Sequence, residues 1–167
     1  MLFYQSMQGF GEQNNSKKKK IKYSSSHKDK IINLALNLHS KGKISEAVKY
    51  YQFCLNQGFN DHRILSNYGI ILQNQGKLIE AESFIRKSIE IKPDFPEAYS
   101  NLGNILSELG KLKDAEISYR RAVQLNPNFI NAHLNLGNIL RELGKLKDAE
   151  ISYRRAVQLN PNFRYAH

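Results

Sequence analysis

The stretch "ELGKLKDAEISYRRAVQLNPNF" at residues 108–129 returns, letter for letter, at residues 142–163. The same step of 34 residues toward the N-terminus finds two weaker copies, and toward the C-terminus it finds the first four residues of another. The chain therefore consists of repeated units at 28–61, 62–95, 96–129 and 130–163, with the start of a truncated fifth unit at 164–167. A unit of this length cannot bury an apolar face alone, so we expect the units to stack into an array.

Each unit has the pattern of two helices joined by a tight turn. Apolar or small residues recur at the third, fourth, seventh, eighth and eleventh places, and a second periodic run follows a glycine at the fifteenth place, such as Gly110. Glycine suits a helix end that needs a positive φ, and proline at the thirty-second place, such as Pro127, closes the second helix in three units. Small residues such as Gly103 and Ala115 let the two helices approach closely. The sequence thus predicts an all-α fold built from helical hairpins.

The motif "NLGNIL…ELGKLKDAEISYRRAVQLNP" resembles the tetratricopeptide repeat at nearly every position, and the resemblance covers residues 28–163. It implies a right-handed α-solenoid of tandem helix–turn–helix repeats, similar to the repeats of bacterial tetratricopeptide proteins. The departures gather in the first unit, where Ala35, Cys54 and Phe59 stand at places that the family fills with glycine, a small residue and proline. We therefore expect the first unit to pack most loosely.

One side of each first helix is polar. At roughly 100° per residue, the second, fifth, sixth, ninth, twelfth and thirteenth places gather on the side opposite the core. In the tetratricopeptide family this side lines the concave groove of the superhelix, where ligands usually bind, so the resemblance implies a peptide-binding groove here. The candidate residues are Asn33, Asn67, Asn101, Asn135, Asn104, Asn138, Arg63, Ser100 and Arg141.

An asparagine stands at the sixth place of every unit, at Asn33, Asn67, Asn101 and Asn135. The first two units agree at only six of 34 places. Packing or backbone geometry explains five of these agreements, but neither explains the asparagine at the sixth place. A side-chain amide both donates and accepts, so four in register predict a ladder that holds about ten residues of an extended peptide. The tetratricopeptide region of the O-linked N-acetylglucosamine transferases has a similar ladder. Two alternatives stay open, namely that the asparagines tether a neighbouring helix or loop, or that duplication preserved them.

No catalytic constellation is present in the sequence. The histidines of the repeats, His39, His62 and His133, lie one to a unit without metal-ligand spacing, and Cys54 stands where the repeat needs a small core residue. No phosphate-binding glycine loop and no nucleophile paired with a base is evident. We therefore predict no enzymatic activity, no metal and no cofactor for this chain. The sequence also does not match the clamp that some tetratricopeptide proteins use for chaperone carboxylates, because Ser100 stands where the clamp has a lysine.

The charge is concentrated at the N-terminus. Residues 1–27 hold five lysines and one glutamate, so they carry +4 of the net charge of +10, and we predict a basic disordered tail there. A signal peptide and a membrane span are not evident, and the cytoplasm is the default location. The true start could be Met1 or Met7.

The predicted function is a protein–protein interaction scaffold that binds an extended peptide segment of a partner along the asparagine-lined groove. An alternative is the N-terminal substrate-recognition module of a larger transferase, such as a glycosyltransferase. Nucleic-acid binding through the lysine-rich tail is a weaker alternative, because the groove mixes acids with bases and has few aromatic residues. The last unit copies an internal one and lacks a polar cap, so we also consider self-association through it.

Overall fold

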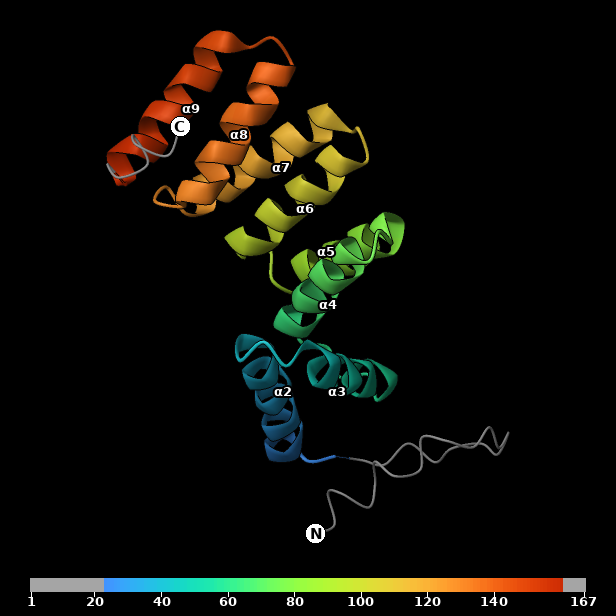
Figure 1. Ribbon diagram of the computed structural model, residues 1–167. Helices are drawn as coiled ribbons and strands as arrows, with labels where there is room; N and C mark the ends of the chain where they lie inside the picture. Colours follow the sequence, from blue (N-terminus) through green and yellow to red (C-terminus); the bar gives the residue numbers. More distant parts are fainter. Residues whose placement is uncertain (1–22, 161–167) are drawn as a thin grey trace.

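The computed structural model describes residues 23–160, and this part of the chain forms eight helices and no strand (Figure 1). The helices pair as two to a repeat, which confirms the predicted all-α fold. Their bounds are α2 Ser25–Ser40, α3 Ile44–Asn56, α4 His62–Asn74, α5 Leu78–Ile91, α6 Pro96–Glu108, α7 Leu112–Leu125, α8 Ile130–Glu142 and α9 Leu146–Leu159.

The helices form two layers that curve together. The first helices of successive repeats, α2, α4, α6 and α8, each contact the next one along the array. The second helices pack against the first helix of their own repeat and of the next repeat, but within residues 23–160 no two second helices approach within 8 Å between Cα atoms. A layer whose members touch lies on the inside of a curve, and a layer whose members are spread apart lies on the outside. The first helices therefore form the inner layer of an α-solenoid (Figure 1).

The turn inside each repeat has the predicted left-handed glycine. Gly42, Gly76, Gly110 and Gly144 have φ values of 72°, 74°, 72° and 73°. At Gly110 the backbone then folds back so that the Lys111 N–H donates to the Leu106 carbonyl, which satisfies a free carbonyl at the end of α6. The same turn in four repeats gives every hairpin the same geometry.

The two helices of a repeat approach closely at the eighth place. A Cβ built on Gly103 would lie 2.6 Å from the ring of Tyr119, and one built on Gly137 would lie 2.5 Å from the ring of Tyr153. In the second repeat, a Cβ on Gly69 would meet the flexible end of Ile85 at 2.7 Å. In the third and fourth repeats the tyrosine rings lie directly against these glycines.

We expect Gly103→Ala to destabilise the fold by about 1–2 kcal/mol, because the rigid ring of Tyr119 cannot move away from the new methyl group as easily as an aliphatic chain. This loss remains after the gain of about 1 kcal/mol that alanine brings to a helix interior. Urea unfolding followed by circular dichroism measures it. Gly69→Ala is the matched control, and it should be close to neutral because Ile85 can change rotamer. Equal losses at the two positions would contradict this account.

The first repeat begins earlier than the sequence predicted. Helix α2 starts at Ser25, the Ser24 side chain caps it by accepting from the His27 N–H, and the Tyr23 ring packs edge-on against Phe53 and Phe59. The predicted boundary of the tail at residue 27 is therefore wrong, because residues 23–27 belong to the first repeat. The rest of the expected tail and the expected fifth unit at 164–167 lie outside the described residues.

The junction between the first two repeats differs from the other two. Helix α3 ends at Asn56 and is soon followed by Gly58, whose φ is 72°, and the Phe59 N–H donates to the Cys54 carbonyl, so a glycine turn replaces the usual proline. Phe59 is buried in a core that the first repeat shares with Ile64 and Ile71 of α4, while a second core begins at Leu72 of the same helix and runs through the third and fourth repeats. Tyr68 touches both cores, and α3 contacts α4 much less than α5 contacts α6. The looseness expected of the first repeat is thus found at its junction and not in its interior.

Candidate functional site

The polar side of the first helices forms one continuous surface on the inner layer, which we call the inner face. It consists of the side chains at the second, fifth, sixth, ninth, twelfth and thirteenth places of α2, α4, α6 and α8. Its polar and charged members are Asp29, Asn33, His39, Ser40, Arg63, Ser66, Asn67, Gln73, Asn74, Glu97, Ser100, Asn101, Asn104, Ser107, Glu108, Asn131, Asn135, Asn138, Arg141 and Glu142.

Three of the four ladder asparagines are held by the preceding repeat. The Nδ2 of Asn67 donates to the hydroxyl of Tyr51 over 3.2 Å, and the Nδ2 of Asn101 donates to the Oγ of Ser66 over 3.3 Å. The Nδ2 of Asn135 donates to the Oδ1 of Asn104 over 3.0 Å. The tethering alternative that the sequence left open is therefore present in the structure. Each tether joins two consecutive repeats.

The same tethers leave one group of each asparagine available. No donor in residues 23–160 bonds to the Oδ1 of Asn67, Asn101 or Asn135. All three side chains are half-buried, so their rotamers are restricted while the carbonyl oxygen keeps its two lone pairs. Among residues 23–160 Asn33 has no such tether, and its side chain is exposed. The arrangement offers a row of fixed acceptors, whereas the sequence predicted a row of donors and acceptors.

The tyrosine at the twenty-fourth place supplies part of this network. The Tyr119 hydroxyl donates to the Oδ1 of Asn104 over 2.7 Å, so this oxygen accepts from both Tyr119 and Asn135. The Tyr153 hydroxyl donates to Asn138 in the same way, over 2.8 Å. The sequence pattern did not identify these tyrosines as part of the polar side. Their recurrence at the 34-residue step was the signal, but nothing in the sequence shows that the hydroxyl reaches the inner face.

Asn104 and Asn138 are therefore positioning residues as much as ligand-binding candidates, because their oxygens are already engaged. Ser100 differs more strongly from expectation: it is buried, with 5% of its surface exposed, so its side chain is not accessible on the inner face. Arg63 is exposed, but Asp61 holds it through two hydrogen bonds of 3.1 and 2.8 Å at the start of α4. Arg141 is exposed near the end of α8.

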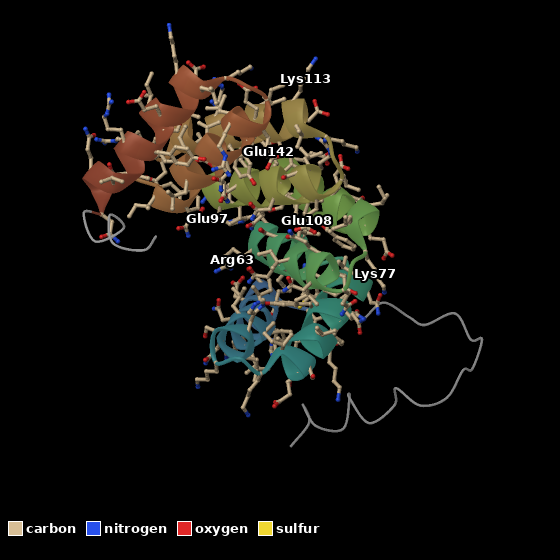
Figure 2. All side chains as sticks on the ribbon, turned by 45° about the horizontal axis from the view of Figure 1, so that its top comes forward. Arg63, Lys77, Glu97, Glu108, Lys113 and Glu142 are labelled. Atoms are coloured by element: carbon tan, nitrogen blue, oxygen red, sulfur yellow. The ribbon has the colours of Figure 1, made fainter. Side chains whose placement is uncertain are left out.

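Acidic side chains outnumber basic ones on the inner face. Asp29, Glu97, Glu108 and Glu142 stand against Arg63 and Arg141. Burial raises the pKa of the Tyr119 hydroxyl, and the negative charges of Glu108 and Glu142 raise it further, which places both carboxylates near the tyrosine. Figure 2 shows Glu108 and Glu142 toward the middle of the view, while Lys77 lies farther to the right. The inner face is thus acidic in a chain whose net charge is +10.

A chain of hydrogen bonds connects the first repeat to the second. The Tyr51 hydroxyl accepts from Asn67 and lies 2.9 Å from the Nδ1 of His39. Because the hydroxyl proton is not needed by Asn67, it can be donated to a neutral imidazole. Burial lowers the pKa of His39, and it is also the main cause that lowers the pKa of His62, which lies edge-on against Phe95.

We expect the free energy of unfolding to fall as the pH decreases through about 6.5. The pKa values of His39 and His62 are lower in the folded state, so below the unfolded pKa the unfolded chain binds protons that the folded chain does not. Urea unfolding at several pH values in this range, which lies above the range in which carboxylates titrate, measures the slope of the free energy of unfolding against pH. The variant with His39→Gln and His62→Gln should lose most of it. A slope that is unchanged in this variant would contradict the assignment.

The part of the chain that the structure describes has no group of three or more metal-binding side chains and no helix that is long and apolar enough to cross a membrane. Cys54 is fully buried, and this burial raises its pKa to about 12. The thiol is therefore neither a reactive nucleophile nor a metal ligand in the folded protein.

Comparison with known families gives one consistent match. Family models described as tetratricopeptide repeat match residues 29–61, 62–95, 96–129 and 130–163. No curated protein matches the sequence significantly.

Solved structures with a similar fold include three kinds of protein. A structure of MamA has a TM-score of 0.71 and 21% identity, covering 84% of this chain and 76% of its own. PilF of Pseudomonas aeruginosa has a TM-score of 0.69 and 21% identity, and the match covers 80% of this chain and 61% of PilF. The first tetratricopeptide domain of Spaghetti (RPAP3), bound to the HSP90 peptide SRMEEVD, has a TM-score of 0.60 and 29% identity. This match covers 61% of this chain and 81% of that domain's chain.

Proposed function

The chain belongs to the tetratricopeptide repeat family, and we propose that it is a protein-interaction scaffold whose inner face holds an extended peptide segment of a partner. The similar RPAP3 domain, which was solved with a bound peptide, supports a peptide as the class of ligand. All of the family matches along the chain are to repeats of this one kind. The proposal therefore places the activity in recognition and assigns no chemical step to the chain.

The observation that carries the proposal is the row of fixed Oδ1 acceptors at Asn67, Asn101 and Asn135. Neighbouring packed helices lie about 8–10 Å apart, so successive acceptors have about that spacing. A polyproline-II chain advances about 3.1 Å per residue and has three residues per turn, so every third peptide N–H points the same way at about 9 Å intervals. The ligand is therefore a segment that presents a backbone N–H to the inner face at every third residue, whatever the side chains between them.

The charge of the inner face indicates what kind of peptide binds. An acidic surface favours ligands with lysine or arginine and disfavours acidic peptides such as SRMEEVD, which the similar RPAP3 domain binds. It also disfavours nucleic acid on this face, because phosphates need neutralising cations. The lysine-rich stretch at 17–20 lies outside the described residues. We therefore propose a basic, extended protein segment as the partner.

We expect a bulky label on the inner face to reduce the affinity for a selected peptide by roughly tenfold or more, because it occupies the path of the peptide chain. The ligands are peptides selected from a displayed random library against the whole protein. Glu108→Cys places a single reactive thiol on the inner face, and Ile117→Cys places one on the exposed outer side of α7. A bulky maleimide then labels only the new thiol, because Cys54 is fully buried.

Each unlabelled cysteine variant is the control for its own labelled form. The label at position 117 should leave the affinity unchanged. If the label at 108 has no effect, or the label at 117 has the same effect as the label at 108, the peptide does not lie on the inner face and the proposed function is wrong.

A further inference from the structure

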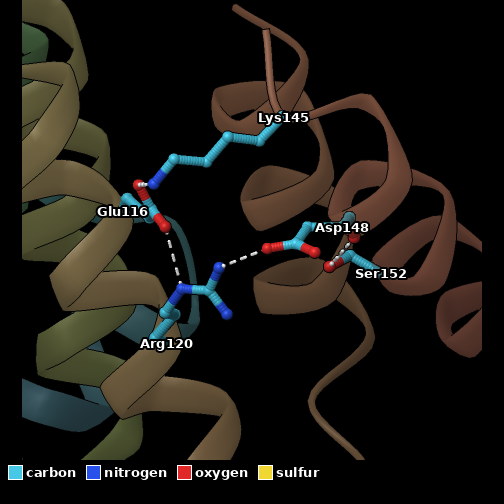
Figure 3. Close-up of polar contacts among 5 residues, drawn as sticks. All are labelled: Glu116, Arg120, Lys145, Asp148 and Ser152. Carbon is cyan, nitrogen blue, oxygen red and sulfur yellow. Dashed lines mark hydrogen bonds and ion pairs between the residues drawn. The ribbon is translucent and has the colours of Figure 1, made fainter. Parts of the chain in front are cut away.

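The second and third junctions between repeats are each held by a buried or half-buried glutamate that binds two cations. Between the third and fourth repeats, Glu116 accepts from Arg120 over 2.9 Å and from Lys145 of the next repeat over 2.7 Å (Figure 3). Burial alone would raise the pKa of Glu116, but the hydrogen bonds from these cations lower it, so the cluster stays ionised near neutral pH. The first junction is built differently, because Val48 stands at the place of the glutamate.

Three hydrogen-bonding side chains, which we call the relay, connect the repeats at the first junction. The Nδ1 of His39, near the end of α2, lies 2.9 Å from the hydroxyl of Tyr51 on α3. The same hydroxyl accepts from the Nδ2 of Asn67, on α4 of the second repeat, over 3.2 Å. Tyr51 is fully buried, and both of its partners are half-buried. The relay thus joins a titratable imidazole to one of the asparagines of the inner face.

The relay permits one arrangement of protons while His39 is neutral. A phenol hydroxyl lies in the plane of its ring, where it donates its own proton on one side and accepts a hydrogen bond on the other. Asn67 fills the accepting side, so the hydroxyl proton points to His39. The Nδ1 of the imidazole then accepts, and the proton of the neutral ring lies on Nε2. The Oδ1 of Asn67 remains directed away from the relay and available on the inner face.

Protonation of His39 conflicts with this arrangement. The imidazolium has a proton on each ring nitrogen, so its Nδ1 donates to the Tyr51 oxygen and the hydroxyl proton turns toward Asn67. The hydroxyl proton and the Nδ2 protons would then face each other. Rotation of the Asn67 amide by a half-turn removes this conflict, because its Oδ1 accepts from Tyr51 and its Nδ2 is directed to the inner face. The two repeats remain joined, but Asn67 now offers a donor.

Burial is the cause that lowers the pKa of His39, and no charged side chain of residues 23–160 contributes to it. From α3 it faces Tyr51, whose pKa is raised by burial, so the hydroxyl keeps its proton wherever histidine titrates. From α4 the relay meets the uncharged Asn67. The charged side chains within α3 are both exposed: Glu46, which pairs with Lys43, and Lys49. The charged and histidine side chains of α4 and its cap lie at the start of that helix: Asp61, His62 and Arg63.

We propose that the relay is a pH switch of the inner face, in which protonation of His39 rotates the Asn67 amide and converts one fixed acceptor into a donor. This inference rests on the proposed function, because it takes the backbone N–H groups of a peptide as the ligand of the acceptors. Acid then removes the acceptor at Asn67 from the peptide. Asn101 and Asn135 donate to Ser66 and Asn104, which do not titrate, so both keep their orientation. The switch therefore weakens the hold on one part of the peptide and leaves the rest bound.

Nitrogen-15 NMR of the whole chain without a ligand tests the switch. We expect the side-chain amide signals of Asn67 to shift with the same pH midpoint as the His39 ring, and the neutral ring to carry its proton on Nε2. The side-chain amides of Asn101 and Asn135 are internal controls and should not follow this midpoint. In Tyr51→Phe the relay is broken while His39 still titrates, so the Asn67 signals should stop following it. Asn67 signals that do not follow His39 in the wild type, or that follow it equally in Tyr51→Phe, would overturn the inference.

The affinity for a selected peptide without histidine, measured by calorimetry between about pH 8 and about pH 5, tests the consequence. It should fall roughly two- to tenfold toward acid, because one hydrogen bond is lost. His39→Gln keeps a neutral acceptor for Tyr51 and should abolish the fall. His62→Gln removes a histidine outside the relay, so this matched control should keep the fall of the wild type.

A wild-type affinity that is constant over this range, or a fall that persists in His39→Gln, would also overturn the inference. The proposed function is tested separately by the label at position 108, because that measurement is made at one pH and does not involve His39. The NMR titration is likewise independent of the proposed function, because it needs no peptide.

Discussion

Alanine at Asn67, Asn101 and Asn135 together is expected to weaken the binding of a library-selected peptide by roughly tenfold to two-thousandfold. Each lost acceptor removes a hydrogen bond worth about 0.5–1.5 kcal/mol, and three such losses add up to that range. Isothermal titration calorimetry with the same peptide measures the effect. The control triple variant places alanine at Asn37, Asn56 and Asn60, which are exposed and lie outside the inner face. If the first triple variant leaves the affinity unchanged, the row of acceptors does not bind the peptide.

A single substitution separates the acceptor from the tether. Asn101→Asp keeps an oxygen at the position of Oδ1 but removes the Nδ2 that donates to Ser66, whose hydroxyl can donate to the new carboxylate instead. We expect peptide affinity to be retained in Asn101→Asp and reduced in Asn101→Ala. Equal losses in the two variants would show that the tether, and not the free oxygen, is what the peptide requires.

Glu116→Gln is expected to lower the free energy of unfolding by about 2 kcal/mol, because Glu116 accepts charge-assisted hydrogen bonds from two cations in a buried setting. Burial alone would raise the pKa of this carboxyl, but the hydrogen bonds from Lys145 and Arg120 outweigh that effect and lower it. Glu150→Gln at the equivalent place of the last repeat should cost no more than about 0.5 kcal/mol, because this glutamate is exposed and has one partner among the described residues.

Urea unfolding of the two glutamine variants makes this comparison within one protein. The cycle of Glu116→Gln and Lys145→Met, alone and combined, isolates the bond that crosses from the third repeat to the fourth. A coupling energy near zero, or equal losses at the two glutamates, would show that the junction is held by apolar packing alone. The measurement is made at a low protein concentration, so that self-association does not add to the stability of the last repeat.

The repeat period alone was enough to predict the fold. The 34-residue step placed glycine at the fifteenth place, and all four of these glycines have the positive φ that ends a first helix. The start of α2 was not predicted because the period was counted from residue 28, although Ser24 has the side chain of a helix cap. The early start depends on the contact of Tyr23 with Phe53 and Phe59, which are far from it in the sequence.

The inner face was predicted less completely, because its chemistry depends on contacts between repeats. A helical projection shows which side chains leave the core, but it does not show which of them the next helix covers. Ser66 and Ser100 are buried for this reason although they project on the polar side. The partner of each ladder asparagine depends on the preceding repeat: Asn67 meets a tyrosine, while Asn101, which follows a repeat with Ile85 at that place, meets a serine. Such pairings are properties of neighbouring repeats, and one repeat considered alone does not contain them.

The division of the core at Tyr68 bears on how the array folds. In a linear array, cooperativity depends on the coupling of each repeat to its neighbours, and the weakest coupling sets where the chain separates into folding units. The first core extends into the second repeat through Ile64 and Ile71, so we expect the boundary between folding units to lie within α4. A peptide that spans Asn33 and Asn101 would contact both units at once. Its binding would couple the two units, so that they would unfold together and not one after the other.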